Sequence, residues 1–518
     1  MKKKLFKTRL LSFAAFCGLT LAFASCANED VAQNPNNTDN DKNLTTFTAG
    51  DPTTRTSMES DGKFFWEAGD KIWVKDDNGT WRQSSNAPTA KAASFKFKVP
   101  GKFTQSSTYK VYYPGKNGNR DKVTIPANQS QSEPNTTTHF GTSGDCGMAD
   151  ASKQSNGSFA FTLDHKAAYL LFLPRTSNTI LQNCYLTKVE INSDNDITST
   201  YILNPTTGKL TGTGTGKQIV LETKGSGTYA NGFPLTNNST NAATNGSYVV
   251  IKPGTHTLKI RYWVKDVVTG TEGTITKTLA SATYDQNKYY NITANLDVKN
   301  YDGDHYYMWD AQEQYWKGFE WTKNLGAGVG QPTLNGNSSS NYAQSNTDPN
   351  NRWYKEGGGS GRFDATQSCA GLPNVNEMTW YAAYGDPRWD RDELWTTMGH
   401  LYKGGMWFKK KSVLLAEGNY NTEKSVDGSD WRTNESDNRW SVSQILPSAA
   451  DAGNYFYLPA LGQYYSGQLD NVADAGGYWS SSASPSYSEY AYRMNFTNSR
   501  VYVQHYTRYT GYRIGTFE

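Results

Sequence analysis

Apolar and polar residues alternate in short runs along the first half of the chain. Ser94–Val99 (SFKFKV) and Thr257–Val264 (TLKIRYWV) both alternate with a period of two, which is the period of a half-buried β-strand. Gly, Asn, Asp and Pro separate these runs at intervals of about ten residues, and helical periodicity is scarce. From about Thr45 to Lys299 the pattern therefore predicts antiparallel β-sandwiches rather than a parallel α/β sheet.

The pattern changes after Tyr301–Asp304 (YDGD). Eleven of the fifteen tryptophans follow residue 300. Asn374 and Glu377 have the spacing of a capping box, and the apolar residues that follow them predict a helix. We expect a second helix around Glu393–Tyr402, with acidic residues at its solvated start. The sequence therefore predicts a separate α+β domain over residues 300–518.

The first residues have the layout of a secretory signal. A basic stretch, MKKKLFKTR, is followed by the apolar run Leu10–Ala24 and by small residues before Cys26. The apolar run is shorter than the roughly 20 residues that a membrane span needs. We expect residues 1–25 to be a signal peptide. Residues 26–44, rich in Asn, Asp and Gln, have too few apolar side chains to fold and are expected to form a disordered tether.

Leu21–Cys26 (LAFASC) resembles a bacterial lipobox, which implies acylation of the Cys26 thiol by chains such as palmitate. Asn28–Asp30 resembles the acidic tag that directs lipoproteins of the Bacteroidetes to the cell surface. Two or three acyl chains form a durable anchor. The resemblance thus implies a lipid-anchored protein on the extracellular face of the outer membrane. The alternative is ordinary cleavage near Ala24, which leaves Cys26 as a thiol.

Charge and chemistry give few further signals. With 51 basic and 48 acidic residues, the net charge of +3 shows no footprint for nucleic acid. HExxH, GxSxG and Walker motifs are absent, and no two of the six histidines have metal-ligand spacing. We therefore expect no catalytic residues, metal or cofactor. Cys146, Cys184 and Cys369 form no disulfide framework, although a bridge from Cys146 to Cys184 stays open.

Three segments resemble fimbrillin-like proteins of Bacteroidetes: Thr54–Val74, Phe161–Pro174 and Lys288–Leu296. The resemblance implies two successive β-sandwich domains, which we place at residues 45–157 and 158–298. Trp66 and Trp73 flank a Gly-Asp turn and are expected in the core. For His165 we expect a turn or edge position rather than a ligand role.

The end of the chain, in Tyr455–Leu469 and Gly476–Phe517, resembles the major paralogous domain of Fibrobacter. That domain is C-type-lectin-like, and similar tails are variable regions of retroelement-diversified proteins. The resemblance implies a lectin-like, ligand-binding domain over residues 300–518. The matching residues are Leu458, Pro459, Gly477, Tyr478, Trp479, Ser480, Ser481, Ser482, Ala491, Tyr492, Phe496, Arg508, Gly511 and Arg513. The calcium motifs of sugar-binding lectins are missing from it; the triplet Glu133–Asn135 lies elsewhere and is expected to be a turn.

Alternation near the C-terminus predicts a binding surface. In AYRMNF and RVYV, the apolar residues Tyr492, Met494, Phe496, Val501 and Val503 are expected to pack inward. The remaining side chains are rich in Tyr and Arg, the types that dominate binding energy at interfaces. The predicted ligand-binding residues are Arg493, Asn495, Arg500, Tyr502, Gln504, His505, Tyr506, Thr507 and Tyr509.

These features favour a lipid-anchored surface adhesin or receptor that binds a glycan or protein ligand through its C-terminal domain. A first alternative is a tip or accessory subunit of a fimbria, which pairs with other subunits by donated strands and in which Arg55 is a processing site. A second alternative is a surface enzyme that acts on glycan, for which the sequence offers no identifiable residues.

The anchor is tested by Cys26→Ala. Because this change removes the acylated thiol, we expect the protein to leave the membrane fraction and to appear in the soluble fraction. Fractionation and mass spectrometry of the mature N-terminus measure both effects. Retention in the membrane, with no acyl mass on the wild-type protein, contradicts the prediction.

Overall fold

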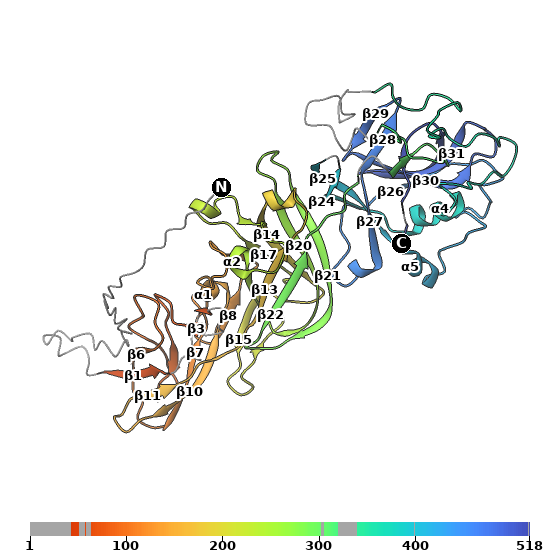
Figure 1. The fold of residues 1–518 in the computed structure, drawn as a ribbon. Helices are drawn as coiled ribbons and strands as arrows, with labels where there is room; N and C mark the ends of the chain where they lie inside the picture. Colours follow the sequence, from red (N-terminus) through yellow and green to blue (C-terminus); the bar gives the residue numbers. More distant parts are fainter. Residues whose placement is uncertain are drawn as a thin grey trace, which may run out of the picture. The chain divides into compact units, whose positions relative to one another are not determined.

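The computed structural model describes residues 43–50, 57–58, 64–301, 305–319, 339–397, 399–515 and 517–518. The predicted signal peptide (1–25), Cys26, nearly all of the tether predicted at 26–44, and Arg55 lie outside these residues. Strands dominate the described chain (Figure 1), so the mainly β fold class is confirmed. Among the described helices, none has the length and apolar character needed to cross a membrane.

The first sheet has eight strands around an aromatic core. Its order is β5 (Trp81–Gln83), β4 (Trp73–Lys75), β7 (Thr108–Tyr113), β10 (Gly147–Lys153), β11 (Phe159–Phe161), β1 (Leu44–Ala49) and β6 (Phe95–Pro100), with β12 (Asp164–His165) beside β10. A short pair, β2 (Ser57–Met58) and β3 (Phe64–Phe65), is separate. Trp66 is fully buried with its ring edge-on to Phe97, which confirms its predicted core position. Trp73 is half-buried.

Three further sheets surround the largest apolar core. One has the order β19 (Ser247–Ile251), β13 (Ala168–Arg175) and β22 (Tyr289–Asn295); a second is β16 (Leu210–Thr211), β15 (Ser199–Leu203) and β8 (Lys122–Ile125). The third has nine strands: β27 (Tyr455–Pro459), β25 (His400–Lys409), β24 (Arg388–Thr397), β21 (Glu272–Tyr284), β20 (Gly254–Lys265), β14 (Tyr185–Ser193), β17 (Gln218–Glu222), β9 (Asn128–Ser130) and β18 (Phe233–Pro234). Short helices are α1 (Phe140–Ser143), α2 (Ala242–Asn245), η1 (Leu181–Asn183) and η2 (Gly227–Tyr229).

Strands are exchanged across residue 157, where the sequence places a domain boundary. β8 pairs with β15, and β9 pairs in parallel with β17, although both precede that residue. Conversely β11, which follows it, pairs with β1 and β10. The two predicted sandwiches thus share strands. The domain limits at 45–157, 158–298 and 300–518 stay predictions.

The C-terminal sheet joins the two ends of its own segment. Its order is β23 (Tyr306–Tyr307), β33 (Tyr512–Arg513), β30 (Ala475–Ala483), β31 (Tyr490–Thr497), β32 (Arg500–Thr507) and β26 (Asn438–Ser441), with β28 (Leu461–Tyr465) and β29 (Gln468–Val472) attached to β30. Tyr306 pairs with Arg513, so the first and last strands lie side by side. Helices α4 (Val375–Tyr384), α5 (Lys411–Ala416) and η4 (Ala452–Asn454) complete this part of the described chain.

Helix α4 begins as the sequence predicts. The Asn374 side chain accepts a hydrogen bond from the Glu377 amide, and the Glu377 carboxylate accepts one from the Asn374 amide. This capping box pairs two amides that the helix itself leaves unsatisfied. Met378 and Tyr381 are fully buried against the C-terminal core, so the predicted apolar face is also confirmed.

The second predicted helix, at Glu393–Tyr402, is wrong. The segment instead forms β24 and β25, which pair antiparallel around a turn at Gly399, where φ is +76°. Aromatic and β-branched residues at Trp395, Thr396 and Thr397 favour a strand, and pairing with β25 and β21 decides between strand and helix. Asp390 is correspondingly buried in a strand and not at a solvated helix start.

The described chain contains three buried thiols and several buried polar groups, and no disulfide joins the thiols. Cys146, Cys184 and Cys369 are free, so the bridge from Cys146 to Cys184 is not formed. His165 is buried at β12, with its Nδ1 atom 2.8 Å from an Asp145 carboxylate oxygen. The triplet Glu133–Asn135 forms the predicted turn, with Asn135 at φ +56°.

Alternation in β31 and β32 sets the C-terminal core. Tyr492, Met494, Phe496, Val501 and Val503 are fully buried in one apolar cluster, as predicted. Every second residue of each strand contributes to this cluster because successive side chains point to opposite faces of a sheet. The other face carries the remaining side chains of the two strands, and at its Ala491 end it packs against a second, smaller apolar cluster that includes Trp479 and Tyr512.

Val503→Asp tests this division of the strand. The change places a carboxylate in an apolar core with no cation, so we expect the free energy of unfolding of the C-terminal part to fall by about 3–5 kcal/mol. The exposed neighbour Arg500 provides the control, since Arg500→Asp is expected to stay within about 0.5 kcal/mol. Urea unfolding followed by tryptophan fluorescence measures both variants; equal midpoints contradict the assigned faces.

Candidate functional site

The register of β31 and β32 places six predicted ligand-binding residues on one face of the sheet. Arg493 is opposite Gln504, Asn495 is opposite Tyr502, and Ala491 is opposite Tyr506. Directly paired residues of antiparallel strands project to the same side, and Arg500 shares that side by alternation. We call this surface the outer face; its predicted members are Arg493, Asn495, Arg500, Tyr502, Gln504 and Tyr506.

The other three predicted residues lie elsewhere. His505 and Thr507 project to the opposite side of β32, because consecutive residues of a strand alternate. The His505 ring contacts Tyr487 and Tyr490, and its Nδ1 atom is 3.5 Å from Glu435. Tyr509 follows the end of β32. The nine predicted residues therefore do not form the one continuous surface that the sequence predicts, whereas the ligand role of each residue stays a prediction.

Arg493 is buried rather than exposed, with 6% of its surface accessible. Its guanidinium carbon lies 4.0 Å from the centroid of the Tyr506 ring and 4.7 Å from that of Tyr512. Nη1 donates a hydrogen bond to the Tyr512 hydroxyl, which in turn donates to Gln463 Oε1. The two rings cover the faces of the guanidinium, and burial lowers the pKa of Arg493 from its ordinary value, although arginine stays protonated.

Gly477 makes this arrangement possible. A Cβ atom at Gly477 would lie 2.3 Å from two atoms of the Tyr512 ring, far inside a normal contact. The Tyr512 ring therefore rests directly on the backbone of β30. From that position its hydroxyl reaches both Arg493 and Gln463, so β30, β31, β33 and β28 together fix one guanidinium.

Sequence reasoning missed three residues of the outer face: Arg439, Gln463 and Tyr512. Arg439 lies on β26 directly opposite Tyr502. These residues come from strands that the sequence does not show to be neighbours. For Gln463 the sequence held one indication: its neighbour Tyr464 is an aromatic residue that is buried in the core, and successive side chains of a strand point to opposite faces. Gln463 therefore points away from the core.

Tyrosines surround the end of the outer face. Tyr465 is 39% exposed, and its ring centroid is 6.0 Å from that of Tyr509. A hydrogen bond with Tyr509 raises the pKa of Tyr465, and the nearby hydroxyls of Tyr506 and Tyr342 act in the same direction. We call Tyr342, Tyr465, Tyr506 and Tyr509 the tyrosine rim. Tyr465 is exposed, whereas Tyr342, Tyr506 and Tyr509 are half-buried.

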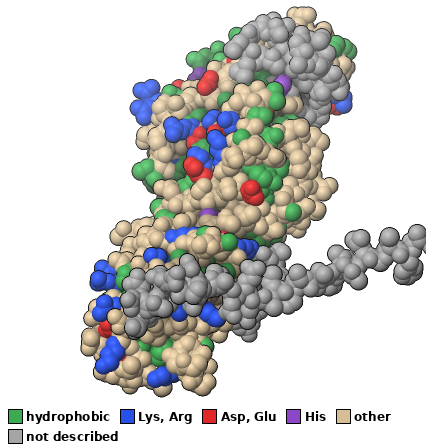
Figure 2. All heavy atoms as spheres, turned by 90° about the vertical axis from the view of Figure 1, so that its left-hand side faces the viewer, with side chains coloured by type: hydrophobic (Ala, Val, Ile, Leu, Met, Phe, Trp, Pro, Cys, Tyr) green, Lys and Arg blue, Asp and Glu red, His purple; other side chains and the backbone are tan. Residues whose placement is uncertain are grey.

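Basic side chains outnumber acidic ones on the outer face. Arg439, Arg493 and Arg500 lie on it, and Asp470, opposite Gln463 on β29, is the carboxylate that the strand register adds. Among the described residues, none of the three arginines forms an ion pair with a carboxylate. On the face drawn in Figure 2, by contrast, basic side chains stand beside acidic ones.

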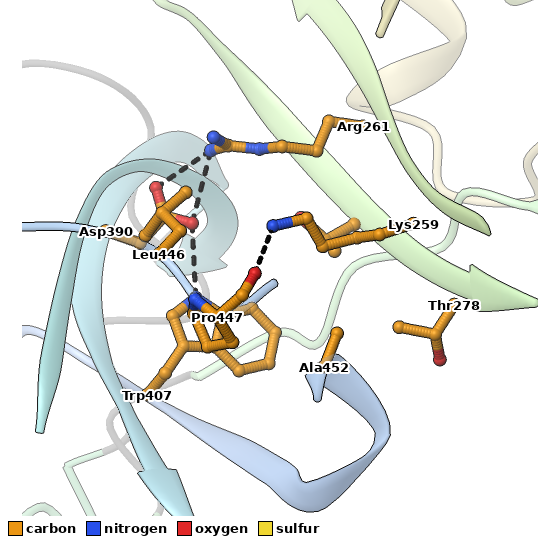
Figure 3. A pocket seen from close by; sticks show the side chains of 9 residues that line it. Lys259, Arg261, Thr278, Asp390, Trp407, Leu446, Pro447 and Ala452 are labelled. Carbon is orange, nitrogen blue, oxygen red and sulfur yellow. Dashed lines mark hydrogen bonds and ion pairs between the residues drawn. The ribbon is translucent and has the colours of Figure 1, made fainter. Parts of the chain in front are cut away.

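A pocket where β20 and β21 meet the C-terminal segment is a second candidate (Figure 3). It encloses about 290 Å³, including the open space at its mouth, and Trp407, Leu446, Pro447 and Ala452 form its apolar wall. Lys259 and Arg261 point into it from β20. Thr274 of β21 pairs in parallel with Glu393 of β24, so the sheet continues across this junction.

The polar groups of the pocket bind one another. Arg261 Nη2 is 2.9 Å and 3.2 Å from the two Asp390 oxygens, and Trp407 Nε1 donates to the same carboxylate at 3.1 Å. Lys259 Nζ donates to the Pro447 carbonyl, and burial lowers the pKa of this lysine. Burial and the nearby Asp390 raise the pKa of Glu393, which accepts hydrogen bonds from Thr276. These contacts stabilise the junction and leave little capacity for a ligand.

No group of three or more His, Cys, Asp or Glu side chains with metal-binding geometry occurs among the described residues. The arrangement with the most unused binding capacity is therefore the outer face and the tyrosine rim. Exposed Tyr and Arg side chains bind through ring faces, hydroxyls and guanidinium donors.

Comparisons with known proteins give only distant likenesses. No family model and no curated protein matches the chain. A solved candidate cell adhesion protein from Bacteroides ovatus is 15% identical, with a TM-score of 0.31, over 49% of this chain and 93% of its own. One from Bacteroides uniformis is 18% identical, with a TM-score of 0.26, over 49% and 92%. A fimbrial protein from Bacteroides ovatus is 11% identical, with a TM-score of 0.24, over 90% and 98%.

The junction predicts a specific mutational pattern. Arg261→Met leaves Asp390 buried without its cation, so we expect a loss of about 3 kcal/mol or more in the free energy of unfolding. Adding Asp390→Asn removes the unpaired charge while keeping an acceptor for Trp407, and is expected to recover most of that loss. Calorimetric melting of the wild type, single and double variants measures both steps. An additive double variant contradicts the pairing.

Proposed function

We propose that this protein is a cell-surface adhesin or receptor that binds a glycan or protein ligand through the outer face of its C-terminal region. The observation that carries the proposal is the convergence of Asn495, Tyr502 and Gln504 on one face of β31 and β32. The opposite face of the same two strands packs in a fully buried apolar cluster, so the strands that carry these side chains are rigidly held.

The remaining segments have roles that agree with this proposal. The signal peptide and Cys26 would attach the protein by lipid to the extracellular face of the outer membrane. Two fimbrillin-like β-sandwiches would precede a C-type-lectin-like α+β region, so that the mainly β chain would end in an α+β domain. The large buried cores and short exposed loops of the sandwich region support a structural role for it.

Two alternatives remain from the sequence. In a fimbrial tip or accessory subunit, strand β1 would be a point of exchange, because it lies between β11 and β6 in a sheet and is joined to residues near Arg55. Polymer ladders on an unboiled denaturing gel would favour that role. Glycan hydrolysis is the other alternative, and no particular arrangement of described residues favours it.

Tyr502→Ala tests the proposed binding surface. Tyr502 is half-buried on the outer face, so its removal is expected to cost about 1–3 kcal/mol of binding free energy while melting stays within about 0.5 kcal/mol. Full-length protein in detergent is applied to a glycan array and to immobilised extracellular matrix proteins. The matched control is Tyr289→Ala, an exposed tyrosine of β22.

Loss of binding in Tyr502→Ala, with Tyr289→Ala unchanged, supports the outer face. Normal binding by a folded Tyr502→Ala variant places the site elsewhere. So does a loss of binding that merely follows a loss of folded protein.

A further inference from the structure

Buried arginines of this protein generally have well-defined acceptors. Arg261 has Asp390 at 2.9 Å, Arg352 has Asp348 at 2.7 Å, and Arg432 has Asp430 at 2.8 Å. Arg508, which is fully buried, donates to three backbone carbonyls, those of Tyr490, Lys355 and Gly357. These contacts follow the rule that a buried charge needs a partner.

Arg493 departs from this pattern. Its exposed fraction is 6%, yet its hydrogen-bond acceptor among the described residues is the neutral Tyr512 hydroxyl. Its buried Nε atom has no partner there, as is also true of Arg261 Nε and Arg508 Nη2. Two tyrosine rings stabilise the cation through their faces but supply no negative charge. Arg493 is thus a guanidinium on the outer face that has no carboxylate or carbonyl acceptor among the described residues.

The surroundings add positive charge. Arg439 and Arg500 lie on the same face and have no carboxylate partner among the described residues, and Asp470 is the opposing charge that the register places there. A guanidinium binds carboxylate, sulfate or phosphate oxygens through a planar fork of donors. The outer face is thus complementary to an anionic group.

The neighbours of Arg493 also limit the rest of the ligand. Asn495 and Gln504 present amides, and Asn495 uses its Nδ2 to donate to the Gly476 carbonyl at 3.0 Å, so its Oδ1 can accept. In the tyrosine rim, one face of the Tyr506 ring lies on Arg493, whereas the Tyr465 side chain is 39% exposed. Stacking surfaces combined with amide donors and acceptors suit the apolar faces and hydroxyl groups of sugar rings.

We infer that the ligand of the outer face is an acidic glycan, whose carboxylate or sulfate binds at Arg493 while its sugar rings stack on the tyrosine rim. This inference rests on the proposed function and adds the chemical class of the ligand. Arg493 contacts the anion, Arg439 and Arg500 contribute attraction from the edge, and Tyr512 and Gln463 hold the guanidinium in place.

The test compares three polymers immobilised on a sensor surface: polygalacturonate, which carries carboxylates, dextran sulfate, which carries sulfates, and neutral dextran. Full-length protein in detergent is passed over each at about physiological salt, where weak surface attraction is screened. We expect binding to one or both acidic polymers and none to dextran. Comparing polygalacturonate with dextran sulfate shows whether the protein prefers a carboxylate or a sulfate group.

Arg493→Gln is expected to weaken binding to the acidic polymer by about tenfold or more, because charge-assisted hydrogen bonds are lost. Arg493→Lys keeps the charge but loses the fork, so intermediate binding is expected. Arg120→Gln, which removes an exposed arginine from the sandwich region, is the matched control and is expected to bind as wild type. Should Arg493→Gln fail to fold, the exposed pair Arg439→Gln and Arg500→Gln replaces it.

Three results overturn the inference: equal binding to dextran and the acidic polymers, no binding to either acidic polymer, or wild-type binding by a folded Arg493→Gln variant. An equal loss in Arg120→Gln also overturns it, since that shows general attraction to polyanions. Binding of a neutral glycan or a protein that Tyr502→Ala abolishes would sustain the proposed function while overturning the acidic ligand.

Discussion

Backbone pairing between strands that are far apart in the chain is the constraint on which this structure depends. β8 and β9 cross to pair with β15 and β17, and β23 pairs with β33 at the opposite end of its segment. Each pairing closes a sheet edge that would otherwise expose amides and carbonyls. The outer face depends on such pairing in part: β31 and β32 form a hairpin, whereas Arg439, Gln463 and Tyr512 come from the more distant strands β26, β28 and β33.

Local signals predicted local features well. The capping box at Asn374, the inward set around Val503 and the burial of Trp66 depend on near neighbours in the chain, and all three are confirmed. The helix predicted at Glu393–Tyr402 failed because two neighbouring strands outweigh a weak helical pattern. The burial of Arg493 was equally invisible, since Tyr512 reaches it from another strand.

The two polar regions of the molecule use charge in different ways. At the junction of β21 and β24, Arg261 and Asp390 satisfy each other, so charge there fixes the position of one segment against the next. At the outer face, Arg493 is held by aromatic rings, and the electrostatic interaction is left incomplete. The two buried arginines therefore differ in their acceptors: Arg261 has a carboxylate, whereas Arg493 has a neutral tyrosine hydroxyl.

The contact between Gly477 and the Tyr512 ring has a consequence for how this surface can evolve. Any side chain at position 477 would displace the Tyr512 ring and release Arg493. Almost no substitution of Gly477 is therefore tolerated. Positions 495, 502 and 504, in contrast, lie on β31 and β32 and are half-buried. Substitutions at these three positions can therefore change the chemistry of the surface while the contact between Gly477 and Tyr512 stays constant.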